Sequence, residues 1–208
     1  MTEHITLPQS AIVPASDYVI IGGTGDLALR KIFPALFLRY AAGQVTDDFR
    51  LYVVGRQTID PAEFRSKLAP HCLLEDNELD DGDALMDRFM RLINFACVDI
   101  NADGGMQELA GDLLSRATAG RPIIFYLSIA SSLFSAASKR IAEAGLALPQ
   151  SRLVVEKPLG HDQASAEEIN DELLLVFRES QIYRITPFSS SFKSKLFLHL
   201  LDQVMQQF

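Results

Sequence analysis

Long apolar runs are absent from this sequence, and so is a cationic leader segment. No stretch approaches the ~20 apolar residues that a membrane-spanning helix needs. The N-terminal segment MTEHITLPQSAIVPASD contains no positively charged stretch followed by an apolar core, which a secretory signal requires. We therefore expect a cytoplasmic protein with no membrane partner.

Cysteine is scarce as well. The two cysteines, Cys72 and Cys97, do not form a CxxC motif. This usage favours a reducing compartment in which both thiols are buried or inert. His71 precedes Cys72, but no second pair of ligands follows at metal-binding spacing, so no metal site is predicted.

Positive charge is also in deficit. The chain has 27 acidic residues against 19 lysines and arginines, which gives a formal net charge of -8. Proteins that bind nucleic acid need clustered cations to displace the counterions of the phosphate backbone. A nucleic-acid partner is therefore not expected.

The sequence does contain a regular alternation of strand-like and helix-like segments. Hydrophobic residues make up 48% and charged residues 22%, as in ordinary globular domains. Short β-branched or apolar runs predict strands at 18–23, 50–56, 95–100, 122–129, 152–159 and 181–185. Several of these runs lack alternation, which is typical of strands covered on both faces.

Helical periodicity fills the intervals between these runs. The expected helices lie at 26–42, 61–70, 83–93, 104–118, 132–144 and 163–178. Pro34 should kink the first helix, and Asp162 is placed to cap the last. The pattern predicts an α/β fold, a Rossmann-like doubly wound parallel sheet with helices on both faces. We expect an N-terminal extension at 1–16, the Rossmann domain at 17–185 and a divergent tail at 186–208.

The first predicted strand ends in a glycine turn, within VIIGGTGDLALRK. Gly22 and Gly25 flank a tight turn from which a helix opens near Asp26, and Ala28 is small enough to pack on the strand. Such a turn lets backbone N–H groups and a helix N-terminus approach a pyrophosphate. The spacing is G-x-x-G-x-x-A rather than the full dinucleotide fingerprint, and the alternative is an ordinary glycine turn.

Two further positions suggest coenzyme chemistry. Arg56 and Gln57 end the second strand, where NAD-binding domains usually carry an acidic residue for the ribose 2′-hydroxyl. A guanidinium there suits the 2′-phosphate of NADP; the alternative is a solvated surface arginine. Glu156 and Lys157 come at the end of a buried strand, where ligands bind in open α/β sheets, and a strand-end ion pair is the alternative.

GGTGDLALRKIFPALF, EKPLG and FRESQIYRI occur in that order over some 170 residues, and together they resemble the N-terminal coenzyme domain of the glucose-6-phosphate dehydrogenase family. The resemblance implies NADP binding by residues of the glycine turn, namely Gly22, Gly23, Thr24, Gly25, Asp26 and Leu27. It implies 2′-phosphate contacts for Arg56 and Gln57, and coenzyme contacts for Asp99 and Ile100. Lys157 would serve coenzyme and substrate, Lys31 would lie in the same cleft, and Pro158 would be the family's cis proline.

The sequence departs from the family after Ile185. The family continues with D-H-Y-L-G-K-E, which supplies substrate-phosphate contacts, whereas this chain continues with Thr186 and Pro187. None of its histidines matches the family's catalytic base, so no catalytic residue is assigned; they are His4, His71, His161 and His199. A truncated or frameshifted gene would give this pattern. The tail segment FKSKLFLHLLDQVMQQF reads as an amphipathic helix that could cap apolar surface or drive self-association.

Three functions remain open. The resemblance implies oxidation of glucose 6-phosphate to 6-phosphogluconolactone with NADP, in the pentose phosphate pathway, if the missing segment is supplied elsewhere. The alternative is a fragment that binds NADP without catalysis, and this alternative describes the sequence better. A short-chain reductase would need a Tyr-x-x-x-Lys pair, and none of the lysines has a tyrosine four residues earlier.

Overall fold

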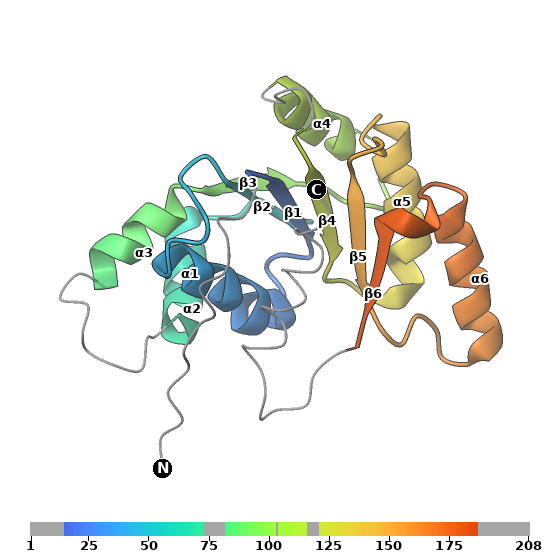
Figure 1. Cartoon of the computed structure of the whole chain (residues 1–208), viewed down its shortest axis with the longest axis horizontal. Coiled ribbons are helices and arrows are strands. Elements are labelled where there is room, and N and C mark those ends of the chain that lie inside the picture. Colours follow the sequence, from blue (N-terminus) through green and yellow to red (C-terminus); the bar gives the residue numbers. More distant parts are fainter. Residues whose placement is uncertain (1–14, 73–81, 103, 116–120, 187–208) are drawn as a thin grey trace, which may run out of the picture.

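A six-stranded parallel sheet forms the centre of the molecule (Figure 1). The computed structural model describes residues 15–72, 82–102, 104–115 and 121–186. The strands are β1 Asp17–Ile21, β2 Arg50–Gly55, β3 Ile93–Cys97, β4 Ile123–Leu127, β5 Arg152–Glu156 and β6 Ile182–Ile185. Their order, β3-β2-β1-β4-β5-β6, is that of a dinucleotide-binding Rossmann sheet, so the predicted fold class is confirmed.

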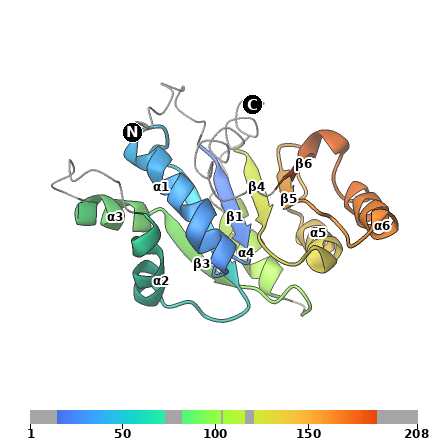
Figure 2. The same cartoon turned by 90° about the horizontal axis from the view of Figure 1, so that it is seen from below.

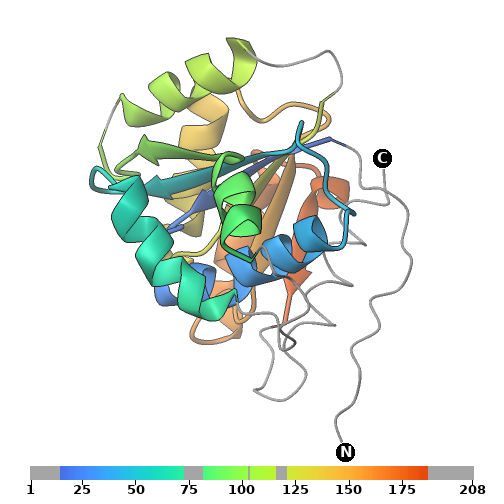
Figure 3. The ribbon, with the colours of Figure 1, turned by 90° about the vertical axis from the view of Figure 1, so that its left-hand side faces the viewer.

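Helices cover both faces of this sheet, as Figure 3 shows. The helices are α1 Phe33–Ala41, α2 Pro61–Leu68, α3 Gly82–Met90, α4 Gly105–Ser115, α5 Phe134–Glu143 and α6 Gln163–Leu174. Residues of α1, α2 and α3 share one buried cluster with the sheet, and residues of α4, α5 and α6 share the other. Figure 2 shows α1, α2 and α3 grouped away from α5 and α6.

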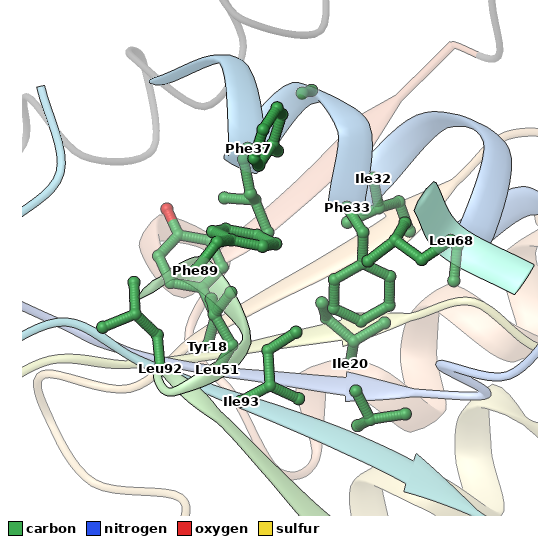
Figure 4. Close-up of a cluster of buried hydrophobic side chains, with 14 of the residues drawn as sticks. Tyr18, Ile20, Ile32, Phe33, Phe37, Leu51, Leu68, Phe89, Leu92 and Ile93 are labelled. Atoms are coloured by element: carbon green, nitrogen blue, oxygen red, sulfur yellow. The ribbon is translucent and has the colours of Figure 1, made fainter. Parts of the chain in front are cut away.

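The cluster under α1 is rich in aromatic side chains (Figure 4). Phe33 of α1 meets Phe64 of α2 edge to face, with 5.2 Å between ring centroids. Phe64 meets Phe95 of β3 in the same way at 5.3 Å, while Phe37 of α1 meets Phe89 of α3 at 5.4 Å. These ring contacts hold α1 and α2 against the half of the sheet that contains β1, β2 and β3.

The predicted interruption at Pro34 takes the form of a π-helical turn. Residues Ala28–Ile32 form this turn (η1) directly ahead of α1, and the Phe33 N–H donates to the Ala28 carbonyl five residues back. Proline has no N–H for the usual bond, and its ring crowds the preceding turn. Widening the helix by one residue removes this conflict without ending the helix.

The last helix begins as predicted and ends early. The Asp162 carboxylate accepts from the Ser165 N–H at 2.8 Å, and the Ser165 hydroxyl accepts from the Asp162 N–H at 3.1 Å. These two bonds form a capping box. The helix was expected to reach residue 178 but ends at Leu174, because Phe177 turns back into the core, where it is 1% exposed.

The two cysteines differ in their surroundings. Cys72 is buried, and burial raises the pKa of its thiol to about 12. Cys97 is exposed at the end of β3, so of the two expected alternatives, a buried or an inert thiol, burial does not apply to this residue. β3 is an edge strand and has a neighbouring strand on one side only. Cys97 is its last residue, so few other side chains cover it.

Among the described residues, no helix is both long and apolar enough to cross a membrane. The amphipathic helix predicted in the tail lies in residues 187–208, outside the described part of the chain.

Candidate functional site

The order of the strands reverses at β1, which lies between β2 and β4 (Figure 1). The chain leaves β1 toward β2 on one side, and later returns to β4 on the other. Loops on either side of such a reversal diverge from each other, so a crevice opens at the carboxyl ends of these strands. The glycine turn follows β1 and therefore lies at this crevice.

Crowding fixes the shape of the glycine turn. Gly22 has a φ of +82°, and a Cβ built there would lie 2.2 Å from the Ser128 carbonyl oxygen, which follows β4. A Cβ on Gly23 would lie 2.9 Å from the Ile20 oxygen. Only glycine fits both positions, because the backbones of β1, β2 and β4 meet here.

The amides of this turn divide into two groups. Gly22 and Gly23 both donate to the Val54 carbonyl, at 2.9 and 3.0 Å, so these two amides are already used within the sheet. Gly25 donates to Gly22 at 2.9 Å. Several amides at the start of the helix find no backbone acceptor in the described chain, among them those of Thr24, Asp26 and Leu27.

Unpaired amides at a helix start bind anions. They carry the partial positive charge of the helix dipole, and Thr24 and Asp26 are exposed to solvent. Close by, the hydroxyl of Ser128 is buried without a hydrogen-bond partner among the described residues. The donor set therefore fits a pyrophosphate at the mouth of the crevice.

A cleft of about 570 Å³ opens beside the turn, at the ends of β2 and β3. Its lining residues come from the glycine turn, the π turn, the loop after β2, helix α2 and the loop after β3: Thr24, Leu29, Arg56, Gln57, Thr58, Ile59, Asp60, Glu63, Phe64, Lys67 and Asp99. The structure thus brings together four of the predicted residues, which are separated by up to 75 positions in the sequence: Thr24, Arg56, Gln57 and Asp99.

Hydrogen bonds already engage the three carboxylates of this cleft. Asp60 accepts from the Ala62 N–H at 2.9 Å, Asp99 accepts from the Asn101 N–H at 3.0 Å, and Glu63 accepts from Lys67 at 2.5 Å. Arg56 is exposed and has no partner within the described residues. The guanidinium of Arg56 is therefore available to an anionic ligand.

Lys157 lies in a separate cleft of about 600 Å³, with β1 and β4 between the two. The lining residues are Lys157, Pro158, Leu159, Gly160, His161, Asp162, Ala166 and Thr186. The Lys157–Pro158 peptide bond is cis, as predicted. The Lys157 N–H donates to the Ile185 carbonyl at 2.6 Å, which ties the end of β5 to β6.

Glu156 has a different partner from the one that the adjacent lysine suggested. Tyr126 of β4 donates its hydroxyl to Glu156 at 2.6 Å, and the described chain contains no ion pair between Glu156 and Lys157. Burial and the neighbouring carboxylate raise the pKa of Tyr126 above its usual range. The Tyr126 hydroxyl therefore stays protonated and donates to Glu156. The side chain of Lys157 is exposed.

Three predicted residues contribute less directly to these clefts. Lys31 is half-buried on the π turn and lines neither cleft. Ile100 is 6% exposed and packs in the core, and its carbonyl accepts from Arg140 at 3.2 Å. Asp26 pairs with Arg30 one turn later on the exposed surface of the helix.

Sequence reasoning missed the contribution of α2. Glu63 and Lys67 line the Arg56 cleft from this helix; their spacing of four residues predicts a pair on one helical face, but not that this face meets the cleft. Within the described residues, no group of three His, Cys, Asp or Glu side chains is placed to hold a metal ion.

Residues 19–189 match the family described as glucose-6-phosphate dehydrogenase, NAD binding domain. The glucose-6-phosphate 1-dehydrogenase of Rhizobium meliloti is 38% identical over 180 residues, which cover 85% of this chain and 36% of the relative. That of Zymomonas mobilis is 40% identical over 173 residues, covering 82% and 34%. The chain therefore spans about a third of the length of the curated relatives it matches.

Solved structures give the same match. A glucose-6-phosphate dehydrogenase in complex with its substrate glucose-6-phosphate superposes with a TM-score of 0.75 and 27% identity, over 85% of this chain and 37% of that one. A glucose-6-phosphate 1-dehydrogenase from Mycobacterium avium superposes with a TM-score of 0.68 and 27% identity, over 83% and 36%.

Proposed function

The chain belongs to the glucose-6-phosphate dehydrogenase family, and from this premise we propose that residues 17–185 form a domain that binds NADP. The observation that carries the proposal is Arg56 in the cleft beside the glycine turn, where no other described residue pairs with its guanidinium. The amides of Thr24, Asp26 and Leu27 would hold the pyrophosphate, and Arg56 with Gln57 would hold the 2′-phosphate.

The preference for NADP over NAD follows from the charges in the cleft. A 2′-phosphate is doubly charged near neutral pH, and a guanidinium can donate two parallel hydrogen bonds to it. NAD presents only a hydroxyl at that position, which gives Arg56 little to bind. The three carboxylates of the cleft are already engaged by neighbouring donors and compete less for Arg56.

We propose that this chain takes part in glucose 6-phosphate oxidation only when a further segment supplies the catalytic base. When bound, the coenzyme accepts a hydride, and a base must lie within about 3 Å of the departing proton. Lys157 is exposed at the second cleft and would bind oxygen atoms of coenzyme and substrate there. The match covers about a third of the relatives' length, so coenzyme binding is the role that this chain's residues support by themselves.

Substitution of Arg56 tests the coenzyme preference. Arg56→Ala should weaken NADP binding by about 1.5–3 kcal/mol, the loss of one charge-assisted contact, and should leave NAD binding nearly unchanged. Arg56→Lys keeps the charge but loses the paired donors, so its affinity for NADP should lie between those of the wild type and Arg56→Ala. Arg91→Ala is the matched control, since Arg91 is exposed and does not line the cleft. Equal losses for NADP and NAD in Arg56→Ala, measured by calorimetric titration, would refute the assignment.

A further inference from the structure

Helix α2 turns one side toward the Arg56 cleft. Phe64 is 2% exposed and packs between Phe33 and Phe95, which fixes the rotation of the helix about its axis. At 3.6 residues per turn, Glu63 and Lys67 lie next to each other on the helix surface, both to one side of Phe64. Both residues line the cleft at the border between the buried ring and solvent.

Lys67 is the second cation of this cleft, and it is held at the border by Glu63. The Lys67 Nζ lies 2.5 Å from the Glu63 Oε1, and the two side chains are 59% and 60% exposed. An ammonium group has three donors, so Lys67 can keep Glu63 and still donate to a phosphate oxygen. The lysine is therefore positioned by the protein before any ligand arrives.

We infer that Lys67 is a second ligand of the coenzyme's 2′-phosphate and that Glu63 limits its strength, an inference that rests on the proposed NADP function. Two cations, Arg56 and Lys67, match the double charge of the phosphate, whereas the Glu63 carboxylate competes with the phosphate for the Lys67 ammonium group. Lys67 and Glu63 together set how strongly the site prefers NADP to NAD.

The predicted effects are modest in size because the pair is exposed. Lys67→Met should weaken NADP binding by about fivefold, near the upper end for an exposed charge pair, and should change NAD binding by less than about twofold. Glu63→Gln should strengthen NADP binding by about two- to threefold, because it releases the Lys67 ammonium group from a competing carboxylate. In the double variant, the gain from Glu63→Gln should shrink, because the ammonium group that Glu63 partly neutralises is gone.

The experiment titrates the full 208-residue chain with two pairs of probes. NADP is compared with NAD, and adenosine 2′,5′-bisphosphate with adenosine 5′-monophosphate, because each pair differs only in the 2′-phosphate. Lys139→Met and Glu172→Gln are the matched controls: this pair, at 3.5 Å between α5 and α6, is 54% and 35% exposed and does not line the cleft. The controls should leave both affinity ratios unchanged.

The outcomes separate this inference from the proposed function. If Lys67→Met weakens NADP and NAD equally, or weakens neither while Arg56→Ala still abolishes the NADP preference, Lys67 is not a phosphate ligand although the NADP site stands. If neither Arg56→Ala nor Lys67→Met changes the NADP-to-NAD ratio, the proposed function fails as well. A selective loss in Lys67→Met together with a smaller Glu63→Gln gain in the double variant confirms the inference.

Discussion

At the end of β1, Gly22 meets two separate requirements. Its φ of +82° lies in a region that residues with a side chain rarely adopt, and its missing Cβ leaves room for the Ser128 carbonyl. The first requirement concerns the local backbone, and the second concerns the approach of β4. The two can be separated, because Gly43 has a similar φ of +69° but open space around it.

We predict that Gly22→Ala destabilises the chain more than Gly43→Ala. Both variants should lose about 1–2 kcal/mol for the left-handed backbone. Gly22→Ala should lose several kcal/mol in total, because the 2.2 Å contact with the Ser128 oxygen forces β1 and β4 apart. Urea unfolding of both variants measures the difference. Similar losses would mean that the contact with Ser128 does not constrain the switch point.

Single residues could be singled out as candidates where the chemistry is local. The glycine turn and Arg56 were identified from residue type and position at strand ends, and the structure places Thr24 and Arg56 at one cleft. Lys67 was not identified, because its place at the cleft depends on how Phe64 docks α2 on the sheet. That docking is a tertiary property with no signal in the sequence of α2 alone.

Among the elements, each predicted strand overlaps an observed one and is too long, and the segment 95–100 is also displaced, since β3 begins at Ile93 and ends at Cys97. The predicted segment 152–159 continues past Glu156 into the cis Lys157–Pro158 bond, and the segment 18–23 includes Gly22 and Gly23. Apolar content continues past the last ladder hydrogen bond, because loop residues at this edge are also partly buried. The pattern of hydrophobicity therefore marks burial more faithfully than it marks pairing.

The amino edge of the sheet depends on a buried charge cluster that sequence patterns did not reveal. Asp17 is 1% exposed and accepts from the Arg50 Nε and the Arg121 Nε, each at 2.7 Å. These residues come from β1, β2 and the segment before β4. One carboxylate thus ties together the strands on both sides of the switch point.

Replacing this carboxylate should cost more than replacing a surface one. Asp17→Asn leaves two largely buried guanidiniums, 14% and 11% exposed, without an anion, and we expect a loss of about 3–5 kcal/mol in the free energy of unfolding. Asp47→Asn, at an exposed aspartate that accepts from Tyr40, is the control and should lose about 1 kcal/mol or less. Urea denaturation decides, and a loss under 1 kcal/mol in Asp17→Asn would contradict this account of the edge.

At the scale of the whole molecule, the alternation of strands and helices was enough to predict a doubly wound sheet, since few other topologies satisfy it. The relation between the two clefts was not predictable in this way. Arg56 and Lys157 follow β2 and β5, and the strand order places β1 and β4 between them. A dinucleotide that reached both clefts would cross the glycine turn, where the amides of Thr24, Asp26 and Leu27 have no backbone acceptor among the described residues.

Calorimetric titration of the purified chain with NADP and, in parallel, with NAD shows directly whether the domain binds NADP and prefers it. We expect one saturable NADP site per chain, with NAD bound at least about tenfold more weakly because it offers Arg56 no phosphate. Absence of NADP binding, or equal affinity for the two coenzymes, would contradict this expectation.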